Sequence, residues 1–184
     1  MVKQETNKRI NVALLTWFSA NKRPLPWRQT KNPYHIWLSE IILQQTRVAQ
    51  GTPYYQRFIE NYPTVEHLAA ADEQEVLKLW QGLGYYSRAR NLHATAKMIA
   101  EKYKGIFPDD VKEILSLKGI GDYTAAAIIS IAFNKPFAVL DGNVFRVLSR
   151  LFLIETPINA PEAKKIFQTK AQELLDKDNP GEFN

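Results

Sequence analysis

Leu117-Lys118-Gly119-Ile120-Gly121-Asp122-Tyr123 is a tight glycine turn between two segments with helix-forming patterns. The segment 111–117 has apolar residues at helical spacing, and the small-residue run 124–132 predicts a closely packed helix. Because glycine lacks a Cβ and adopts positive φ, Gly119 and Gly121 would let backbone N–H groups and the next helix's N-terminus face a phosphate. For an isolated turn, simple capping of the two helices is the better explanation. Motifs elsewhere in the chain are needed to choose between phosphate binding and simple capping.

Composition describes a basic globular protein. Its 184 residues include 24 Lys+Arg and 19 Asp+Glu, a net charge of +5 that favours an anionic partner without proving one. Neither a membrane-spanning apolar run nor a signal core is present, so we expect an intracellular protein without a membrane partner. The absence of Cys excludes disulfides, thiolate catalysis and Cys-ligated zinc or iron–sulfur clusters held by these residues. His35, His67 and His93 are not at ligand spacing, so we expect no metal.

Apolar periodicity predicts an all-α fold of about nine or ten helices, without strand-like alternation or repeats. The proline-punctuated stretch 21–28 is the first boundary on the domain scale. The final residues 176–184 predict no closing element. The expected helical segments are 8–20, 34–49 continuing through 53–58, 64–68, 72–77, 85–103, 111–117, 124–132, 144–153 and 161–175.

Two carboxylates are candidates for glycosidic bond chemistry. Such cleavage needs an acid for the leaving group and a carboxylate that stabilises the developing sugar cation. Glu40 lies in the mostly apolar run 37–46, where burial would raise its pKa towards that of a useful acid. From position alone, a solvated helix charge is the simpler explanation of Glu40. Asp141 precedes the segment 144–153, where it is also explained as an N-cap.

Four separate motifs follow one another along the chain, and together they are more specific than any one of them. They are Trp37-Leu38-Ser39-Glu40-Ile41-Ile42-Leu43-Gln44-Gln45-Thr46, then Gly82-Leu83-Gly84-Tyr85-Tyr86 with Arg88-Ala89-Arg90-Asn91-Leu92, then the turn at 117–123, and Leu140-Asp141-Gly142-Asn143-Val144. In this order they resemble the MutY-type adenine DNA glycosylases of the endonuclease III superfamily, over nearly the whole chain. We therefore interpret the glycine turn as a DNA-binding helix-hairpin-helix.

The resemblance implies a helix-hairpin-helix glycosylase fold. A six-helix barrel lobe would span 21–133, with the helix-hairpin-helix at 111–133, and an incomplete second helical lobe would combine 1–20 with 134–184. The implied enzyme is a monomer that removes adenine mispaired with 8-oxoguanine or guanine by flipping it out of double-stranded DNA. Its expected place is the bacterial cytoplasm, on the nucleoid.

Residue roles follow from the same resemblance. Glu40 matches the general acid that protonates adenine N7, and Asp141 matches the carboxylate that stabilises the sugar cation through a transient covalent adduct. Tyr123 stands where lyase-competent relatives carry a Schiff-base lysine, and because a phenol cannot form an imine we expect a monofunctional glycosylase. The other expected site residues are Gln44, Gln45, Tyr85, Arg88, Lys118, Gly119 and Gly121 at the DNA, with Gln45 and Tyr85 as wedges, and Trp27, Arg28 and Asn143 at the adenine pocket.

Simpler explanations exist for several of these residues. Paired glutamines such as Gln44 and Gln45 are usually solvated, and Tyr85 is equally well a core aromatic without the resemblance. Arg88 and Lys118 would otherwise be plain surface charges.

The chain departs from the family beyond residue 184. Family members continue through four cysteines that ligate a [4Fe-4S] cluster and into a separate domain that recognises 8-oxoguanine. We therefore expect a catalytic-domain part of a longer protein, weakly active or inactive alone, with no cofactor of its own and the cluster in the full-length relative. Two other functions stay open: a non-catalytic helix-hairpin-helix DNA-binding module, and an endonuclease III-like glycosylase/lyase, which would need an amine nucleophile.

Overall fold

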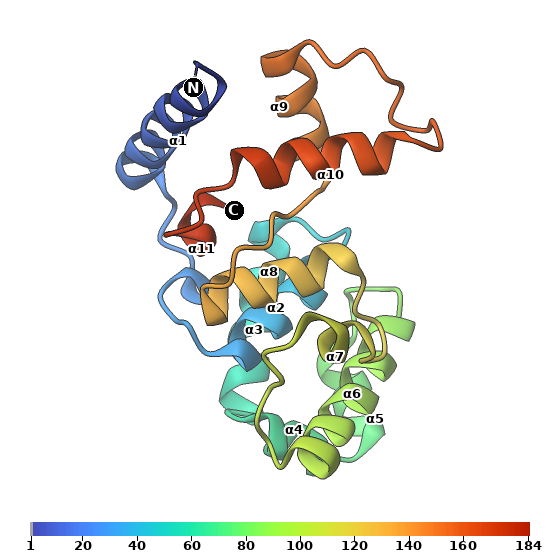
Figure 1. Cartoon of the computed structure of the whole chain (residues 1–184). Helices are drawn as coiled ribbons and strands as arrows, with labels where there is room; N and C mark the ends of the chain where they lie inside the picture. Colours follow the sequence, from blue (N-terminus) through green and yellow to red (C-terminus); the bar gives the residue numbers. More distant parts are fainter. Residues whose placement is uncertain (1) are drawn as a thin grey trace. The chain divides into compact units, whose positions relative to one another are not determined.

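The computed structural model describes residues 2–184, with side chains from residue 5 onward, and confirms the all-α prediction (Figure 1). This described part contains no strand, and none of its helices is long and apolar enough to cross a membrane. It contains eleven α-helices and one 3-10 helix, slightly more than predicted. They are α1 (Val2–Asn21), η1 (Pro26–Arg28), α2 (Pro33–Leu43), α3 (Val48–Asn61), α4 (Val65–Ala70), α5 (Glu73–Trp80), α6 (Ser87–Tyr103), α7 (Val111–Leu115), α8 (Asp122–Phe133), α9 (Gly142–Phe152), α10 (Ala163–Leu174) and α11 (Pro180–Phe183).

Two compact units divide the chain. One is Pro24–Ala125, and the other combines the described part of Met1–Arg23 with Ala126–Asn184. The division falls within α8. Each unit has a core of its own.

The unit 24–125 is built around α6, which packs against α2, α4 and α5. Its core is rich in large side chains, and Trp37, Phe58 and Trp80 are fully buried. The rings of Phe58 and Trp80 meet edge to face at 5.8 Å between centroids, and those of Trp37 and Phe107 at 5.4 Å. Burying one such aromatic side chain contributes about 1.5–3 kcal/mol. This packing makes α6 a fixed support for the loops around it.

The predicted single helix over 34–49 is wrong. Helix α2 begins at Pro33, where the Asn32 side chain accepts a 2.9 Å hydrogen bond from the Tyr34 amide, but it ends at Leu43. A turn follows in which Gln45 has a φ of 54°, and α3 begins at Val48. Neither glycine nor proline marks this turn in the sequence. The physical reason for the break is a long-range contact from α6, described below.

The second unit buries the facing sides of α9 and α10. The rings of Phe145 and Phe167 lie 4.7 Å apart between centroids, and Leu148 and Leu174 are buried in the same cluster. Helix α10 also packs against α1. These contacts give the residues around Asp141, at the start of α9, a packed base.

The prediction that 176–184 carries no closing element is also wrong. This segment forms α11, and the Asn184 side chain donates to the Phe137 carbonyl at 2.8 Å and accepts from the Val139 amide at 3.2 Å. A Cβ at Gly181 would lie 2.7 Å from the Ser130 carbonyl oxygen, so only glycine permits this close approach. The signal was missed because the segment is too short and polar to show helical periodicity.

Candidate active site and nucleic-acid interface

The glycine turn joins α7 to α8 as the sequence predicted. The Asp110 side chain caps α7 by accepting from the amides two and three residues later, at 2.8 and 3.2 Å. Leu117 and Ile120 point into the core, with 2% and 7% of their surface exposed, whereas Lys118 and both glycines are exposed. The turn is therefore anchored by its apolar residues and presents its glycine backbone at the surface.

The two glycines differ, although the sequence suggested the same conformational need for both. Gly119 has a φ of 79°, and a Cβ there would lie 2.9 Å from the Asn91 Cβ of α6. Gly121 has no positive φ, and a Cβ there would meet nothing within 4 Å. Gly119 is therefore required by the fold, while the open space at Gly121 is available to an approaching partner.

Helix α6 supports the turn with side chains that sequence reasoning did not select. Asn91 lies beneath Gly119, and the buried Thr95 hydroxyl donates to the Lys118 carbonyl at 2.8 Å. Together with Arg88, these residues are spaced by three or four positions and share one face of the helix. This spacing of polar residues along one predicted helix was the signal available in the sequence.

Arg88 is half-buried and donates to two chain segments at once. Its Nη1 lies 3.0 and 3.1 Å from the carbonyl oxygens of Ile41 and Ile42 in the last turn of α2, and 2.5 Å from that of Gln44, which follows the helix. Its Nη2 lies 3.2 and 3.4 Å from those of Leu83 and Gly84. Cations and donors at a helix C-terminus satisfy its unpaired carbonyls, which explains why α2 stops at Leu43.

The guanidinium also contacts two aromatic rings, those of Trp80 at 5.0 Å and Tyr85 at 5.7 Å from the ring centroids. Burial lowers the pKa of Arg88, with the Tyr85 phenol opposing, yet an arginine stays protonated in proteins. Through these contacts and its hydrogen bonds, the charged Arg88 side chain connects the end of α2 to the loop before α6. A contact between Arg88 and DNA stays a prediction.

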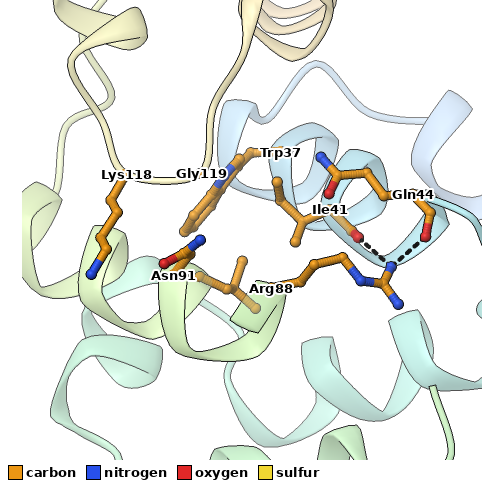
Figure 2. Close-up of a pocket in the computed structure, with 8 residues that line it drawn as sticks. Trp37, Ile41, Gln44, Arg88, Asn91, Lys118 and Gly119 are labelled. Atoms are coloured by element: carbon orange, nitrogen blue, oxygen red, sulfur yellow. Dashed lines mark hydrogen bonds between the residues drawn. The ribbon is translucent and has the colours of Figure 1, made fainter. Parts of the chain in front are cut away.

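A small pocket joins several predicted DNA-binding residues. Figure 2 shows Gln44 and Arg88 on one side of it and Lys118 and Gly119 on the other, with Trp37 and Asn91 between. Its volume is about 30 Å³, room for one or two water molecules and far too little for a nucleobase. This pocket is a junction between α2, α6 and the hairpin, and it is not a base-binding site.

Glu40 lies in the last turn of α2 and is half-buried. Its neighbours Ser39, Ile41 and Ile42 are buried, in agreement with the apolar setting expected from the sequence. Arg88 fixes the carbonyl ends of this same turn, so the backbone that carries Glu40 is held firmly.

Asp141 is the N-cap of α9 and a member of the second unit. Its Oδ1 accepts from the amides of Asn143 and Val144 at 2.9 and 2.8 Å, and its Oδ2 accepts from Asn143 Nδ2 at 3.0 Å. The capping explanation is thus correct for one oxygen. The same three bonds fix the direction of the carboxylate, and they place Asn143 beside it.

Gln45, Tyr85 and Tyr123 all present exposed side chains, with 66% of Tyr85 and 39% of Tyr123 accessible. Tyr85 is therefore not a core aromatic.

Trp27, by contrast, is only 9% exposed and packs edge to face on Tyr55 at 5.2 Å between ring centroids, whereas Arg28 next to it is exposed. A role for Trp27 at a base pocket is therefore limited to the small exposed part of this residue.

Among the described residues, no group of three or more His, Asp or Glu side chains could hold a metal ion. The chain contains no Cys, so its residues do not fit an iron–sulfur cluster, whose ligands are thiolates.

The anchored glycine turn within an all-helical unit defines a helix-hairpin-helix protein. The model of the HhH-GPD superfamily of base excision DNA repair proteins matches residues 38–175, and the chain belongs to this superfamily.

Curated adenine DNA glycosylases are similar to it. One from Buchnera aphidicola subsp. Acyrthosiphon pisum is 41% identical over 93% of this chain, and the human one is 40% identical over 94%. The chain spans 49% and 33% of their lengths, so it corresponds to half or less of these relatives.

Solved structures agree on the fold. A thermostable thymine-DNA glycosylase has a TM-score of 0.90 and 30% identity, with all of this chain and 85% of that one covered. An endonuclease III in a non-covalent complex with DNA has a TM-score of 0.79 at 22% identity, with 100% and 83% covered, and supports the fold alone.

Proposed function

We propose that this chain performs the chemistry of an adenine DNA glycosylase, hydrolysing the N-glycosidic bond of adenine mispaired with 8-oxoguanine or guanine in double-stranded DNA. The observation that carries the proposal is the Asp141 carboxylate, whose direction three hydrogen bonds fix at the start of α9. The proposal is supported by sequence identity of about 40% to adenine DNA glycosylases over nearly the whole chain.

Glu40 and Asp141 have different roles in the proposed reaction. Glu40 protonates adenine N7, so that the bonding electrons of the glycosidic bond can pass to N9 as that bond breaks. The cation that develops at the sugar C1′ is stabilised by Asp141, through a transient covalent adduct, and water finally takes the place of the base. Glu40 is half-buried beside the buried Ser39 and Ile41, which shields the proposed acid from part of the solvent.

DNA would be held and opened by the unit 24–125. The exposed backbone at Gly119 and Gly121 suits a phosphate, with the N-terminus of α8 next to it and Lys118 adding positive charge. Gln44 lies at the end of α2, and the exposed Gln45 and Tyr85 would enter the base stack and offset the stacking energy lost when adenine flips out. Trp27 and Arg28 of this unit, and Asn143 of the second unit, are proposed as adenine-contacting residues.

The glycosylase is proposed to be monofunctional, monomeric and cofactor-free within this chain. Tyr123 offers a phenol where a lyase needs an amine, so no imine with the sugar forms. Its proposed place of action is the nucleoid in a bacterial cytoplasm.

Thymine is the second candidate base. The thymine-DNA glycosylase structure matches this chain at 30% identity and is covered over 85% of its length, a larger share than the adenine enzymes offer. The higher identity of the adenine enzymes, 41%, favours adenine.

The test is single-turnover base release from three duplexes, containing adenine opposite 8-oxoguanine, adenine opposite guanine, or thymine opposite guanine. We expect release of adenine, with strand cleavage only after alkali. Glu40→Gln should slow release by about 100-fold or more, the size of a general-acid contribution. Equal release by this variant would contradict the mechanism.

Three other results would identify another function. Thymine release would select the second candidate, and a borohydride-trapped imine would select a lyase. Tight binding without release from any duplex would mean a DNA-binding module alone.

A further inference from the structure

Two exposed side chains of the unit 24–125 stand on left-handed backbone. Gln45 has a φ of 54° and Tyr85 a φ of 46°, and neither residue is glycine. This conformation costs free energy for any residue with a Cβ, so it persists only where surrounding contacts impose it. Gln45 follows α2 and Tyr85 precedes α6, 40 positions apart in the sequence.

One guanidinium holds the residue before each of them. Arg88 Nη1 lies 2.5 Å from the carbonyl oxygen of Gln44, and Nη2 lies 3.4 Å from that of Gly84. Each of these carbonyls belongs to the peptide bond that leads into the left-handed residue. Figure 2 shows the Arg88 side chain reaching the end of α2 at Ile41 and Gln44.

Neighbouring contacts make this anchor specific to arginine. The indole of Trp80 also donates to the Gly84 carbonyl at 2.9 Å, and its buried ring lies 5.0 Å from the guanidinium. The planar guanidinium presents a fork of donors to carbonyls in two directions, and a lysine ammonium cannot reproduce that geometry. The anchor and both loops therefore form one rigid assembly on α6.

We propose that Arg88 is a positioning residue, which sets Gln45 and Tyr85 in the conformation from which both side chains enter the DNA stack. The inference rests on the proposed function for the wedge role of these two residues. Beyond that function, we infer that Arg88 acts through the two loops and makes no phosphate contact, because both of its terminal nitrogens donate hydrogen bonds to backbone carbonyls.

Amide hydrogen exchange on the free protein tests the anchor without any activity. We compare Arg88→Lys and Arg88→Met with Arg90→Met, a matched control on the same helix whose exposed guanidinium pairs with Glu73 at 3.9 Å. Exchange at 44–46 and 83–86 should rise by about tenfold in both Arg88 variants and stay unchanged in the control. Amides in the middle of α6 report global unfolding. A rise confined to those amides, or none in the loops, would overturn the proposal.

DNA measurements then test what the anchor does. Arg88→Lys should lower single-turnover adenine release and the preference for a mispaired over a fully paired duplex by about tenfold each. In a Gln45→Ala/Tyr85→Ala background, the same substitution should cost less than about twofold, because residues that act as one unit are not additive. A fully additive loss would contradict positioning.

Salt dependence separates positioning from phosphate binding. The slope of log affinity against log salt should be the same for Arg88→Met and the wild type, whereas losing one phosphate contact reduces it by about one. A reduced slope would make Arg88 a phosphate ligand. If the wild type releases no base, the proposed function fails, and the exchange, mispair-preference and salt measurements still decide the role of Arg88.

Discussion

The Thr95 hydroxyl donates a 2.8 Å hydrogen bond to the carbonyl oxygen of Lys118, 23 residues further along the chain. Thr95 is fully buried in α6, and Lys118 directly precedes Gly119 in the hairpin. The geometry of the glycine turn is thus fixed by a helix that the turn does not belong to.

Thr95→Val should destabilise the fold by about 1–2 kcal/mol, because valine keeps the shape of threonine but leaves the Lys118 carbonyl without its donor. Urea unfolding measures this loss. Thr52→Val is the control, since the Thr52 hydroxyl donates to the Val48 carbonyl of its own helix, at 2.8 Å. Equal effects of the two substitutions would show that the contact with the hairpin contributes nothing beyond an intrahelical bond.

Gly119→Ala and Gly121→Ala should separate folding from binding. At Gly119, the φ of 79° and the 2.9 Å approach to the Asn91 Cβ predict a loss of about 1–3 kcal/mol of stability. At Gly121, the open space predicts a smaller loss of stability, about 0.5–1 kcal/mol for a poorer N-cap of α8, but weaker DNA binding, because a methyl group would occupy the surface offered to a phosphate. Thermal unfolding and duplex binding at fixed salt measure the two quantities. Unchanged DNA binding by Gly121→Ala would mean that no DNA phosphate comes close to this glycine.

Sequence patterns predicted the features that depend on nearby residues. The turn at 117–123, the N-cap Asp141 and the helical class all follow from glycine, aspartate and apolar spacing within a few positions. The break after Leu43 was not predicted, because the guanidinium that causes it is supplied from residue 88. The sequence predicts Arg88 as a DNA contact, whereas its structural role depends on backbone carbonyls, which no side-chain pattern reveals.

Asp141→Asn and Asp141→Ala should divide the two roles of this residue. Asparagine caps helices as well as aspartate does, so Asp141→Asn should keep stability within about 0.5 kcal/mol while base release falls by about 100-fold or more. Asp141→Ala should also lose about 0.5–2 kcal/mol of stability, the value of an N-cap. Urea unfolding and single-turnover release provide the measurements.

Asp110 provides the control for capping, since its side chain caps α7 in the same way. Asp110→Ala should lose a similar amount of stability and retain base release under conditions where the protein is folded. Normal release by Asp141→Asn would remove the carboxylate from the chemistry and leave Asp141 a cap only.

His93 lies in the core of the unit 24–125, on α6, with 1% of its surface exposed. Burial lowers its pKa most, and the nearby Lys97 lowers it further, while backbone groups of Ala71 and Ala69 and the Glu73 carboxylate oppose them. Burial likewise lowers the pKa of His35. Both rings therefore favour the neutral form in the folded protein.

The lowered pKa of His93 predicts a loss of stability in mild acid. As pH falls below about 6.5, the ordinary histidine pKa, the unfolded chain takes up a proton before the folded chain does. The contribution of His93 is therefore complete above that pH and decreases towards the lower pKa of the folded state. Urea unfolding between pH 7.5 and about 5 should show a shallower pH dependence for His93→Gln than for the wild type. The His35→Gln/His93→Gln double variant should be shallower still, because each ring adds its own proton uptake. Parallel curves for wild type and His93→Gln would mean that the ring binds its proton equally well in both states, and the acid sensitivity of this unit would then come from another group.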